Sequence, residues 1–586
     1  GAPPRPLLRL RSEPRASGLI RMSSIIARFF SMPLWSPAPP QWTAASLREW
    51  IAARQLYLSV AAVTVATALG MVVRLIPVLR ADFPVNDGGL FYLMVEELRA
   101  ADYVLPAYTS YNSAQIPFAY PPLAFYLAGF ITDITGWPLL EVLRVLPALF
   151  SIATIPAFFL LSRAVLRSWT QATFAVFAFA LLPRTFVWFI MGGGLTRAPG
   201  LFFAVLMLHQ SYLLYTRRET RFVLSTALLG GATVLSHAEA AWFAVYSAVL
   251  LFLFFGRNLK GLIHSFLVML GVLLITAPWW LTVVRFHGIA PFLGAAGSGG
   301  LDRRAGLHHL NTFLFTNERY LPLLAALGLL GIFAALAERK LFLPVWLLAI
   351  FFVNPRNPDT PASLPLAMLV GVALDRLIVP ALWRLGAGAP VQTTGAHPGI
   401  EPSETGMMRR TGRLLPRALP MLMLVYLLAY NFQAARELSL RADALTVLPR
   451  EEREAMQWVA ARTPRGSQFL VLHPGNWFGE DPGSEWFPAL AGRVSLATVQ
   501  GYEWLPGDQF VRRQEPYKAL QACATGEASC LAEWMEETGH SASHVYLGDG
   551  CCGPLERSLR ASPGYRPVYD GARAVIFARS ESPVTP

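Results

Sequence analysis

The sequence predicts an all-α, polytopic membrane domain of about eleven spans, followed by a small extracytoplasmic α/β domain. Of its 586 residues, 54% are hydrophobic and only 15% are charged, whereas an average soluble protein carries roughly a quarter charged residues. Long apolar runs fill residues 56–434, while 450–586 has the composition of a water-soluble sequence. We therefore place the membrane domain at 56–434 and the C-terminal domain at 435–586.

Residues 1–55 are expected to form a basic cytoplasmic tail. The arginines of the first thirty positions are Arg5, Arg9, Arg11, Arg15, Arg21 and Arg28, against the single acid Glu13. A transit peptide has a similar composition. A tail that precedes the first span is the simpler interpretation.

A membrane span needs about 20 mainly apolar residues. The predicted spans lie at 56–79, 139–162, 172–190, 198–216, 222–236, 240–255, 262–284, 320–337, 341–353, 362–381 and 418–434. Residues 80–138 then form the first outer loop, and 382–417 form a cytoplasmic linker.

One apolar stretch in the first outer loop, YPPLAFYLAGFITDITG at 120–136, is interpreted as an interfacial helix and not as a span. With that choice, every basic cluster between spans falls on one side, as the positive-inside rule requires. These clusters include Arg163 and Arg167; Arg217, Arg218 and Arg221; Arg257 and Lys260; and Arg339 and Lys340. The net charge of +12 comes largely from these short clusters, which is typical of cytoplasmic loops and not of a nucleic-acid-binding face. The expected partners are therefore membrane lipids and not nucleic acid.

The C-terminal domain alternates helical and strand patterns. Residues 450–462 predict a helix, and the apolar runs 469–473, 494–499, 544–548 and 574–579 predict strands. All four cysteines lie in this domain. Cys523 and Cys530 have a spacing that suits a disulfide, although reduced, partly buried thiols fit the sequence equally well. The adjacent Cys551 and Cys552 have no assigned state.

The most informative residue is Asp87, which follows the first span and precedes Gly88 and Gly89. A carboxylate at the membrane surface, beneath an outer loop, is well placed to accept a proton from a hydroxyl or an amide. The glycines allow a tight turn and the close approach of a ligand. The same D-G-G pattern also suits a helix N-cap, a role that does not exclude catalysis.

The order of these features resembles the C-type (GT-C) glycosyltransferase superfamily. That order is a span, an outer loop with an early Asp, an aromatic residue, a YPPL-type helix start and further spans. The superfamily includes protein O-mannosyltransferases, the aminoarabinose transferase of lipid A and the catalytic subunits of oligosaccharyltransferases. The resemblance implies that Asp87 is the acceptor-activating base. It also implies that Tyr92, Tyr120, Pro121 and Pro122 shape the substrate cavity.

Two departures from the superfamily pattern stand out. The second outer loop has no acidic residue between Trp188 and Phe203, where relatives place a metal- or acceptor-binding acid, and the WWDYG motif is absent. We therefore assign no metal ligand and no required cofactor, and leave a divalent cation (Mg or Mn) open. Arg197 in this loop either faces an anionic donor or anchors a helix end at the interface.

Other candidate cavity residues lie at later span ends. His237 and Glu239 either face the cavity or cap a helix break. Arg356 matches a loop arginine that binds donor phosphate in the superfamily, and a planar guanidinium suits phosphate oxygens; its alternative role is to anchor lipid head groups. Asp359 is expected to hold Arg356 or to touch the sugar.

The function predicted from these residues and this resemblance is sugar transfer on the extracytoplasmic face, with inversion. The donor is a polyprenyl-phosphate-linked sugar, and the acceptor is a protein, a lipid or a glycan. An alternative is a non-catalytic transporter or flippase for a lipid-linked sugar or polymer. A third is a sugar-binding module in the C-terminal domain, although Trp486 and Trp504 are more typical of a packed core.

Overall fold

The computed structural model describes residues 44–298, 303–312, 314–354, 357–386, 406–442, 445–473, 475, 477–548 and 550–580. The chain divides into two compact units, Gly1–Leu58 and Ser59–Pro586. The contacts discussed below lie within the second unit. The predicted tail 1–55 and linker 382–417 fall largely outside the described residues, and Arg356 does so entirely.

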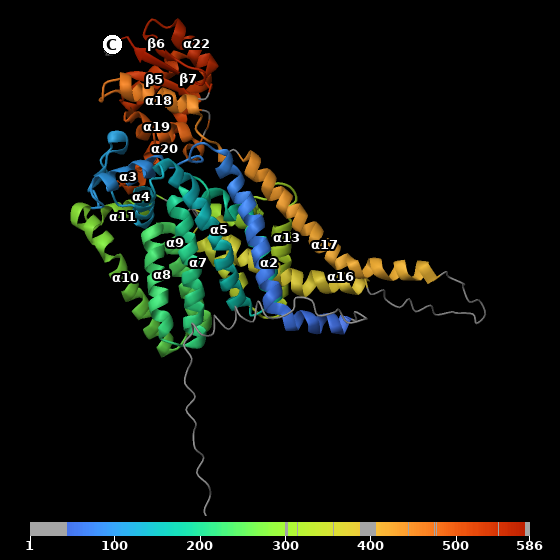
Figure 1. Cartoon of the computed structure of the whole chain (residues 1–586). Helices are drawn as coiled ribbons and strands as arrows, with labels where there is room; N and C mark the ends of the chain where they lie inside the picture. The colour runs from blue at the N-terminus through green and yellow to red at the C-terminus, as the bar shows by residue number, and fades with distance from the viewer. Residues whose placement is uncertain are drawn as a thin grey trace, which may run out of the picture. The chain divides into compact units, whose positions relative to one another are not determined.

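The N-terminal three quarters of the chain is helical (Figure 1). Its helices are α2 (Ala44–Arg80), α3 (Gly89–Ala100), α4 (Leu123–Thr135), α5 (Leu139–Leu166), α6 (Trp169–Leu181), α7 (Gly194–Arg217), α8 (Arg221–Ser236), α9 (Ala238–Leu251), α10 (Leu259–His287), α11 (Ala290–Gly297), α12 (Arg303–Thr312), α13 (Leu323–Ala337), α14 (Phe342–Val353), α15 (Asp359–Ala373), α16 (Val379–Gly386) and α17 (Gly406–Arg441). One short hairpin, β1 (Tyr108–Thr109) with β2 (Ile116–Pro117), lies in the first loop.

The chain is an integral membrane protein, with seven helices in its described part that are long and apolar enough to cross a bilayer. They are Arg54–Arg80, Leu139–Leu166, Gly194–Arg217, Ala238–Gly256, Leu259–His287, Asp359–Arg384 and Ala418–Arg441. An eighth span is formed if the pair Trp169–Leu181 and Pro183–Phe189, bent by 80°, counts as one. The other three predicted spans correspond to α8, α13 and α14, which are apolar but shorter, so the prediction of eleven spans is confirmed only as far as seven or eight.

Helix α4 covers the stretch that was predicted to lie at the interface. It has 13 residues, fewer than the roughly 20 that a straight span requires. The break between α6 and the following 3-10 turn, Pro183–Thr185, occurs at a proline that provides no backbone N–H for the helix.

Helix α15 is the centre of the helical region, and all of its residues are buried. It packs on α13, α6 and α14. A Cβ at Gly331 would collide with the Leu369 carbonyl, and one at Gly371 would collide with the Gln171 carbonyl. Small residues at these crossings let the backbones approach closely, which is how helices associate in membranes without a hydrophobic driving force between them.

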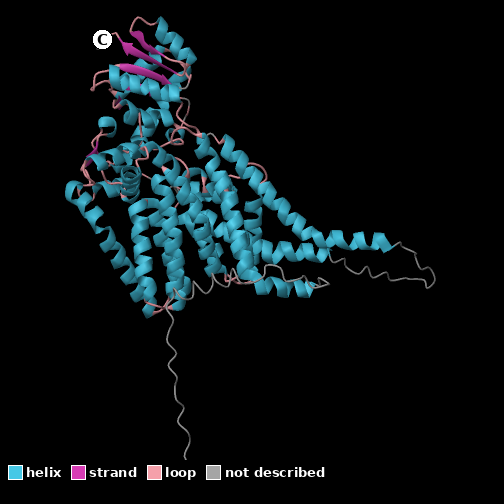
Figure 2. Ribbon diagram, viewed as in Figure 1, coloured by secondary structure: helices cyan, strands magenta, loops and turns pink. Residues whose placement is uncertain are grey.

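The C-terminal region is a mixed α/β domain that contains the large sheet (Figure 2). Its elements are α18 (Arg450–Arg462), β3 (Gln468–Leu472), α19 (Pro482–Ala491), β4 (Val494–Ser495), α20 (Gln509–Ala522), α21 (Ala528–Thr538), β5 (His544–Gly548), α22 (Gly553–Ala561), β6 (Tyr565–Asp570) and β7 (Ala574–Arg579). The strand order is β4-β3-β5-β7-β6, with β3 parallel to β4 and β5, and β7 antiparallel to β5 and β6.

The predicted helix is present, and a strand lies in each of the four predicted runs, although β4 covers only Val494–Ser495 of the run 494–499. Strand β6 was missed. β6 is an edge strand in which no residue is fully buried, and its register shifts between Pro567 and Tyr569. An exposed, proline-containing edge strand lacks the apolar alternation that identifies strands in a sequence.

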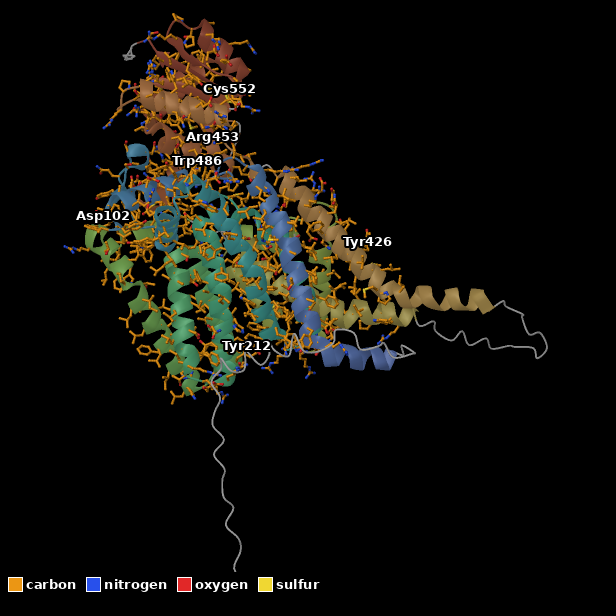
Figure 3. The ribbon with its side chains drawn as sticks, in the orientation of Figure 1. Asp102, Tyr212, Tyr426, Arg453, Trp486 and Cys552 are labelled. Atoms are coloured by element: carbon orange, nitrogen blue, oxygen red, sulfur yellow. A yellow bond between two sulfur atoms is a disulfide. The ribbon has the colours of Figure 1, made fainter. Side chains whose placement is uncertain are left out.

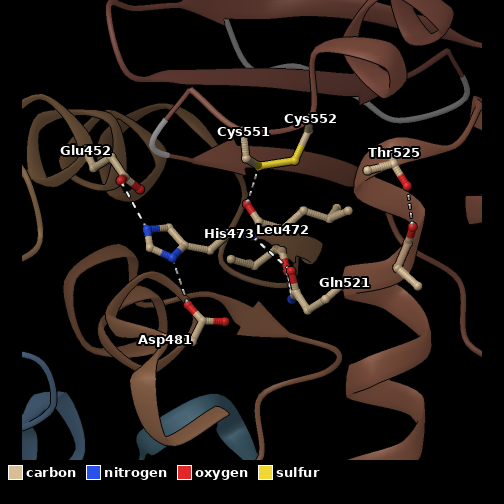
Figure 4. Close-up of a disulfide and its surroundings, with 10 residues drawn as sticks. Glu452, Leu472, His473, Asp481, Gln521, Thr525, Cys551 and Cys552 are labelled. Carbon is tan, nitrogen blue, oxygen red and sulfur yellow. Dashed lines mark hydrogen bonds and ion pairs between the residues drawn. A yellow bond between two sulfur atoms is a disulfide. The ribbon is translucent and has the colours of Figure 1, made fainter. Parts of the chain in front are cut away.

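Both cysteine pairs are disulfides. Cys523 and Cys530, the candidate pair, form a bridge between the end of α20 and α21. The adjacent Cys551 and Cys552 are joined to each other in the turn between β5 and α22, beside the Leu472 carbonyl of β3 (Figure 4).

Candidate functional site

The site is built around Asp87, between the end of α2 and the start of α3. The Gly193 N–H, at the N-terminus of α7, donates to Asp87 Oδ1 over 2.7 Å, and Arg197 on the first turn of α7 forms an ion pair with Asp87 Oδ2. The unpaired N–H groups and the dipole of a helix N-terminus favour a negative charge there. The Asp87 side chain keeps 20% of its surface exposed, so the carboxylate is held in place without being sealed off.

The glycine run Gly192–Gly194 makes this approach of the two loops possible. A Cβ at Gly192 would overlap the Asp87 carbonyl, and a Cβ at Gly193 would overlap the Asp87 carboxylate and the Arg197 guanidinium. The Gly192 N–H also donates to the Val85 carbonyl over 2.9 Å. Glycine is therefore needed for steric reasons at both positions.

Arg197 is positioned by groups other than Asp87. Its Nη1 donates to the Trp188 carbonyl over 3.0 Å, and its guanidinium lies 5.6 Å from the centre of the Trp188 ring. These contacts fix a planar donor fork. The two loop residues named from the sequence, Asp87 and Arg197, are thus brought into direct contact.

The C-terminal domain contributes a residue that the sequence analysis missed, Glu485 of α19. Its carboxylate accepts from the backbone N–H groups of Gly88, Gly89 and Leu90 over 2.9–3.1 Å. Glu485, and not Asp87, therefore caps α3, whose N-cap residue Gly88 has no side chain for this. The distance in sequence between Glu485 and α3 left no local signal for this contact.

Glu485 lies close enough to Asp87 for their charges to interact. Burial, and then the negative charge of Asp87, raise the pKa of Glu485 above its ordinary value. The hydrogen bonds from the three backbone N–H groups lower the pKa of Glu485 and so offset part of this rise. Within this partly buried site, the charge of Asp87 therefore opposes ionisation of Glu485.

Other contacts fasten the first loop to the C-terminal domain beside this site. The Trp486 indole N–H donates to the Asn86 carbonyl over 2.9 Å, and the ring is fully buried. Tyr111 donates to the Glu485 carbonyl over 2.6 Å. Asn112 bonds both backbone groups of Ser495, over 2.9 Å and 2.7 Å.

The predicted aromatic and proline residues lie around the same junction. Tyr92 packs against Trp486, with ring centres 6.1 Å apart. Tyr120 donates to Glu503 of the C-terminal domain over 2.6 Å and packs on Trp504, with ring centres 4.7 Å apart. Pro121 and Pro122 are buried at the start of α4. Trp486 and Trp504 are core residues, in line with the alternative given for them above.

Asp359 forms a second charged cluster, at the first residue of α15. It is 4% exposed and pairs with Arg184 over 3.1 Å and with His309 over 2.9 Å. The structure therefore gives Asp359 two partners that the sequence did not suggest, the guanidinium of Arg184 and the imidazole of His309. Its expected contact with Arg356 falls outside the described residues.

His237 and Glu239 lie where α8 ends and α9 begins. His237 is the N-cap of α9, and its Nδ1 accepts from the Ala240 N–H over 3.4 Å. Glu239 is in the first turn, a favourable position for an acid. The geometry of His237 fits the capping alternative.

The donor set around Asp87 does not fit a divalent cation. Asp87 faces the Arg197 guanidinium and a backbone N–H, and the Glu485 oxygens face three N–H donors. Magnesium and manganese require several oxygen ligands directed at one point. Among the residues that the structure describes, no three His, Cys, Asp or Glu side chains are grouped as metal ligands.

Comparisons with solved structures identify the fold. The archaeal oligosaccharyltransferase AglB from Archaeoglobus fulgidus superposes with a TM-score of 0.53 at 14% identity, over 90% of this chain and 75% of that one. ArnT from Cupriavidus metallidurans in its apo state gives 0.50 at 16% identity, over 91% and 98%. The predicted resemblance to the GT-C glycosyltransferases is therefore confirmed at the level of the fold. No protein-family profile and no curated sequence matches the chain.

Proposed function

We propose that the protein transfers a sugar from a polyprenyl-phosphate carrier to a hydroxyl or amide acceptor, with Asp87 as the base. The observation that carries this proposal is the position of Asp87. It is a partly exposed carboxylate fixed by Gly193 and Arg197, on the loop between α2 and α3, which packs against the C-terminal domain. The site of transfer is the extracytoplasmic face.

The reaction is a single displacement with inversion. Asp87 takes the proton of the acceptor O–H or N–H while the acceptor heteroatom forms a bond to the sugar C1. The bond between C1 and the phosphate oxygen breaks, and its electron pair stays on the carrier phosphate. Because a phosphate oxygen is a weak base, this leaving group needs no general acid.

The two arginines have separate roles in this proposal. Arg197 is a positioning residue that orients Asp87 through their ion pair. Its predicted contact with the donor phosphate is retained as a secondary role. Arg356 is assigned to the departing phosphate, whose growing charge a guanidinium stabilises.

The similarity to AglB supports a lipid carrier and a peptide-like acceptor. That enzyme was solved in complex with dolichol-phosphate and an inhibitory peptide. With the shared fold covering 90% of this chain, the same two classes of ligand are the first to test here. The sugar is identified by assaying a panel of donors.

The proposal is tested with an Asp87→Asn variant purified in lipid nanodiscs. We expect a loss of sugar transfer of about a hundredfold or more, because Asn cannot accept the proton. The assay follows radiolabel from a panel of polyprenyl-phosphate sugars into peptide, lipid and glycan acceptors. Asp102→Asn is the matched control, since Asp102 is exposed on the same loop and Asn tolerates its positive φ. Transfer by folded Asp87→Asn at the wild-type rate contradicts the role of Asp87.

The donor site is tested separately with Arg356→Ala. Loss of a charge-assisted contact of about 1.5–3 kcal/mol is expected to weaken binding of undecaprenyl phosphate by about tenfold to a hundredfold. Native mass spectrometry measures this binding, and acceptor peptide binding is expected to change less. Arg339→Ala, at an exposed arginine between α13 and α14, is the control. If Arg356→Ala retains the carrier as the wild type does, Arg356 is not the phosphate ligand.

A further inference from the structure

A charged cavity lies at the end of the helices opposite from the Asp87 site. Its volume is about 460 Å³, and it is formed by the end of α5, the start of α6 and the last turns of α7. In Figure 3, Tyr212 marks this end of the helices, and Trp486 marks the other. The lining residues are Leu160, Arg163, Ala164, Arg167, Trp169, His209, Tyr212, Leu213, Thr216 and Arg217.

The lining of this cavity is cationic. It contains three arginines and a histidine but no carboxylate. Within the described part of the chain, none of Arg163, Arg167 and Arg217 forms an ion pair with an acid. Like charges that converge on one cavity repel one another, and a bound anion removes that cost.

The guanidinium groups are held in place by aromatic side chains and not by acids. Arg163 lies 4.4 Å from the centre of the Trp169 ring, and Arg167 Nε donates to the Tyr212 hydroxyl over 3.0 Å. Arg217 lies 5.9 Å from the centre of the Phe222 ring. Stacking on an aromatic face fixes a guanidinium while leaving N–H donors for a ligand.

One donor in this cavity has no partner among the residues that the structure describes. The Nε of Arg163 is buried and makes no hydrogen bond to any described residue. A buried N–H without an acceptor destabilises the folded protein, because its hydrogen bond to water is lost and not replaced. An anion seated among the arginines would supply that acceptor.

We propose that this cavity binds a phosphate group, supplied by the head group of an anionic phospholipid. Arginine forks match phosphate oxygens in pairs, and basic pockets between membrane helices on the cytoplasmic side take such head groups. Leu160, Ala164 and Leu213 provide an apolar wall for the lipid beside its charged end. The arginines belong to the basic clusters predicted to face the cytoplasm, so this site is distinct from the proposed transfer site.

The test is native mass spectrometry of the full chain released from mixed vesicles of phosphatidylglycerol and phosphatidylcholine. The wild type is expected to retain phosphatidylglycerol in preference to phosphatidylcholine. In Arg163→Gln/Arg167→Gln, the relative affinity should fall by about tenfold or more, since each lost charged hydrogen bond contributes about 1.5–3 kcal/mol. Arg257→Gln/Lys260→Gln is the matched control, because it removes two exposed charges predicted on the same face.

A second arm identifies the source of the phosphate. Excess inorganic phosphate is added as a competitor and is also tested on the lipid-free protein. If it displaces phosphatidylglycerol and binds with the same dependence on Arg163, the cavity is confirmed as a phosphate site, but its ligand is a soluble phosphate and not a lipid head group. Equal retention of phosphatidylglycerol by the wild type and the cavity variant, or an equal loss in the control, overturns the proposal. Tyr212→Phe, which removes the acceptor that orients Arg167 but keeps the ring, gives a milder loss if the double variant does not fold.

Discussion

At the residue scale, His473 shows how the C-terminal domain tolerates a buried charge. It lies 3.3 Å from Glu452 and 3.2 Å from Asp481 in the interior of the domain, near the Cys551–Cys552 bridge (Figure 4). Burial alone would lower the pKa of His473, but its contacts with Asp481 and Glu452 outweigh burial and raise the pKa to about 10. The imidazolium links two acids that come from different elements.

This linkage predicts a pH dependence of stability. The folded pKa, about 10, is higher than the ordinary value of 6.5. The stabilisation is therefore complete below about pH 6.5 and is lost as the pH rises through about 10. Thermal unfolding in detergent should show the stability of the wild type falling as the pH rises through this window. His473→Gln should be less stable than the wild type by about 3–5 kcal/mol at neutral pH, and its stability should fall less as the pH rises. His540→Gln, at an exposed histidine, serves as control; an equal pH slope in wild type and His473→Gln would refute the assignment.

At the element scale, α3 depends on a cap that comes from another domain. Gly88, Gly89 and Leu90 present the first free N–H groups of α3, and their acceptor is the Glu485 carboxylate of α19. A helix of 12 residues is marginal by itself. The orientation of the loop that carries Asp87 thus depends on the docking of α19.

Glu485→Ala is expected to loosen the start of α3. It leaves three buried N–H groups without an acceptor, at a cost of about 1–3 kcal/mol each. Hydrogen exchange over residues 88–98 should become faster, and sugar transfer should fall even though Asp87 is intact. Glu533→Ala, at an exposed glutamate of the same domain, is the control. Unchanged exchange in α3 would show that the cap does not hold the helix.

At the scale of the whole molecule, the membrane helices and the C-terminal domain meet through the first loop. Asn86 donates from its backbone to the Thr446 carbonyl over 2.8 Å, and Val85 pairs with Val447 in an isolated β-bridge. Phe83 and Trp486 pack with ring centres 4.5 Å apart in one shared core. The proposed catalytic loop is thus part of the interface between the two regions.

Asn112→Gly tests this interface directly. It removes both hydrogen bonds to Ser495, and glycine accepts the positive φ of Asn112 without strain. We expect docking to weaken by about 1–3 kcal/mol and limited proteolysis to release the C-terminal domain faster. Asn317→Gly is the control, because it replaces an exposed asparagine with the same φ of 54°. It is expected to leave the rate of proteolytic release unchanged. Equal rates in all three proteins would show that this pair contributes nothing to docking.

The sequence by itself determined the helical membrane region, the α/β domain and the identity of Asp87 and Arg197 as candidate residues. Hydropathy and periodicity are local properties, so they identify spans and buried strands. They did not identify the edge strand β6, whose residues lack a buried face. Nor did they separate the seven long helices from the shorter apolar ones.

Only the tertiary structure decided which charges meet. It paired Asp87 with Arg197, Asp359 with Arg184 and His309, and Glu485 with the start of α3. These contacts join segments as far apart as 397 residues. They arise because a buried charge or N–H group is stable only with a partner, and the fold, not the neighbouring sequence, supplies that partner.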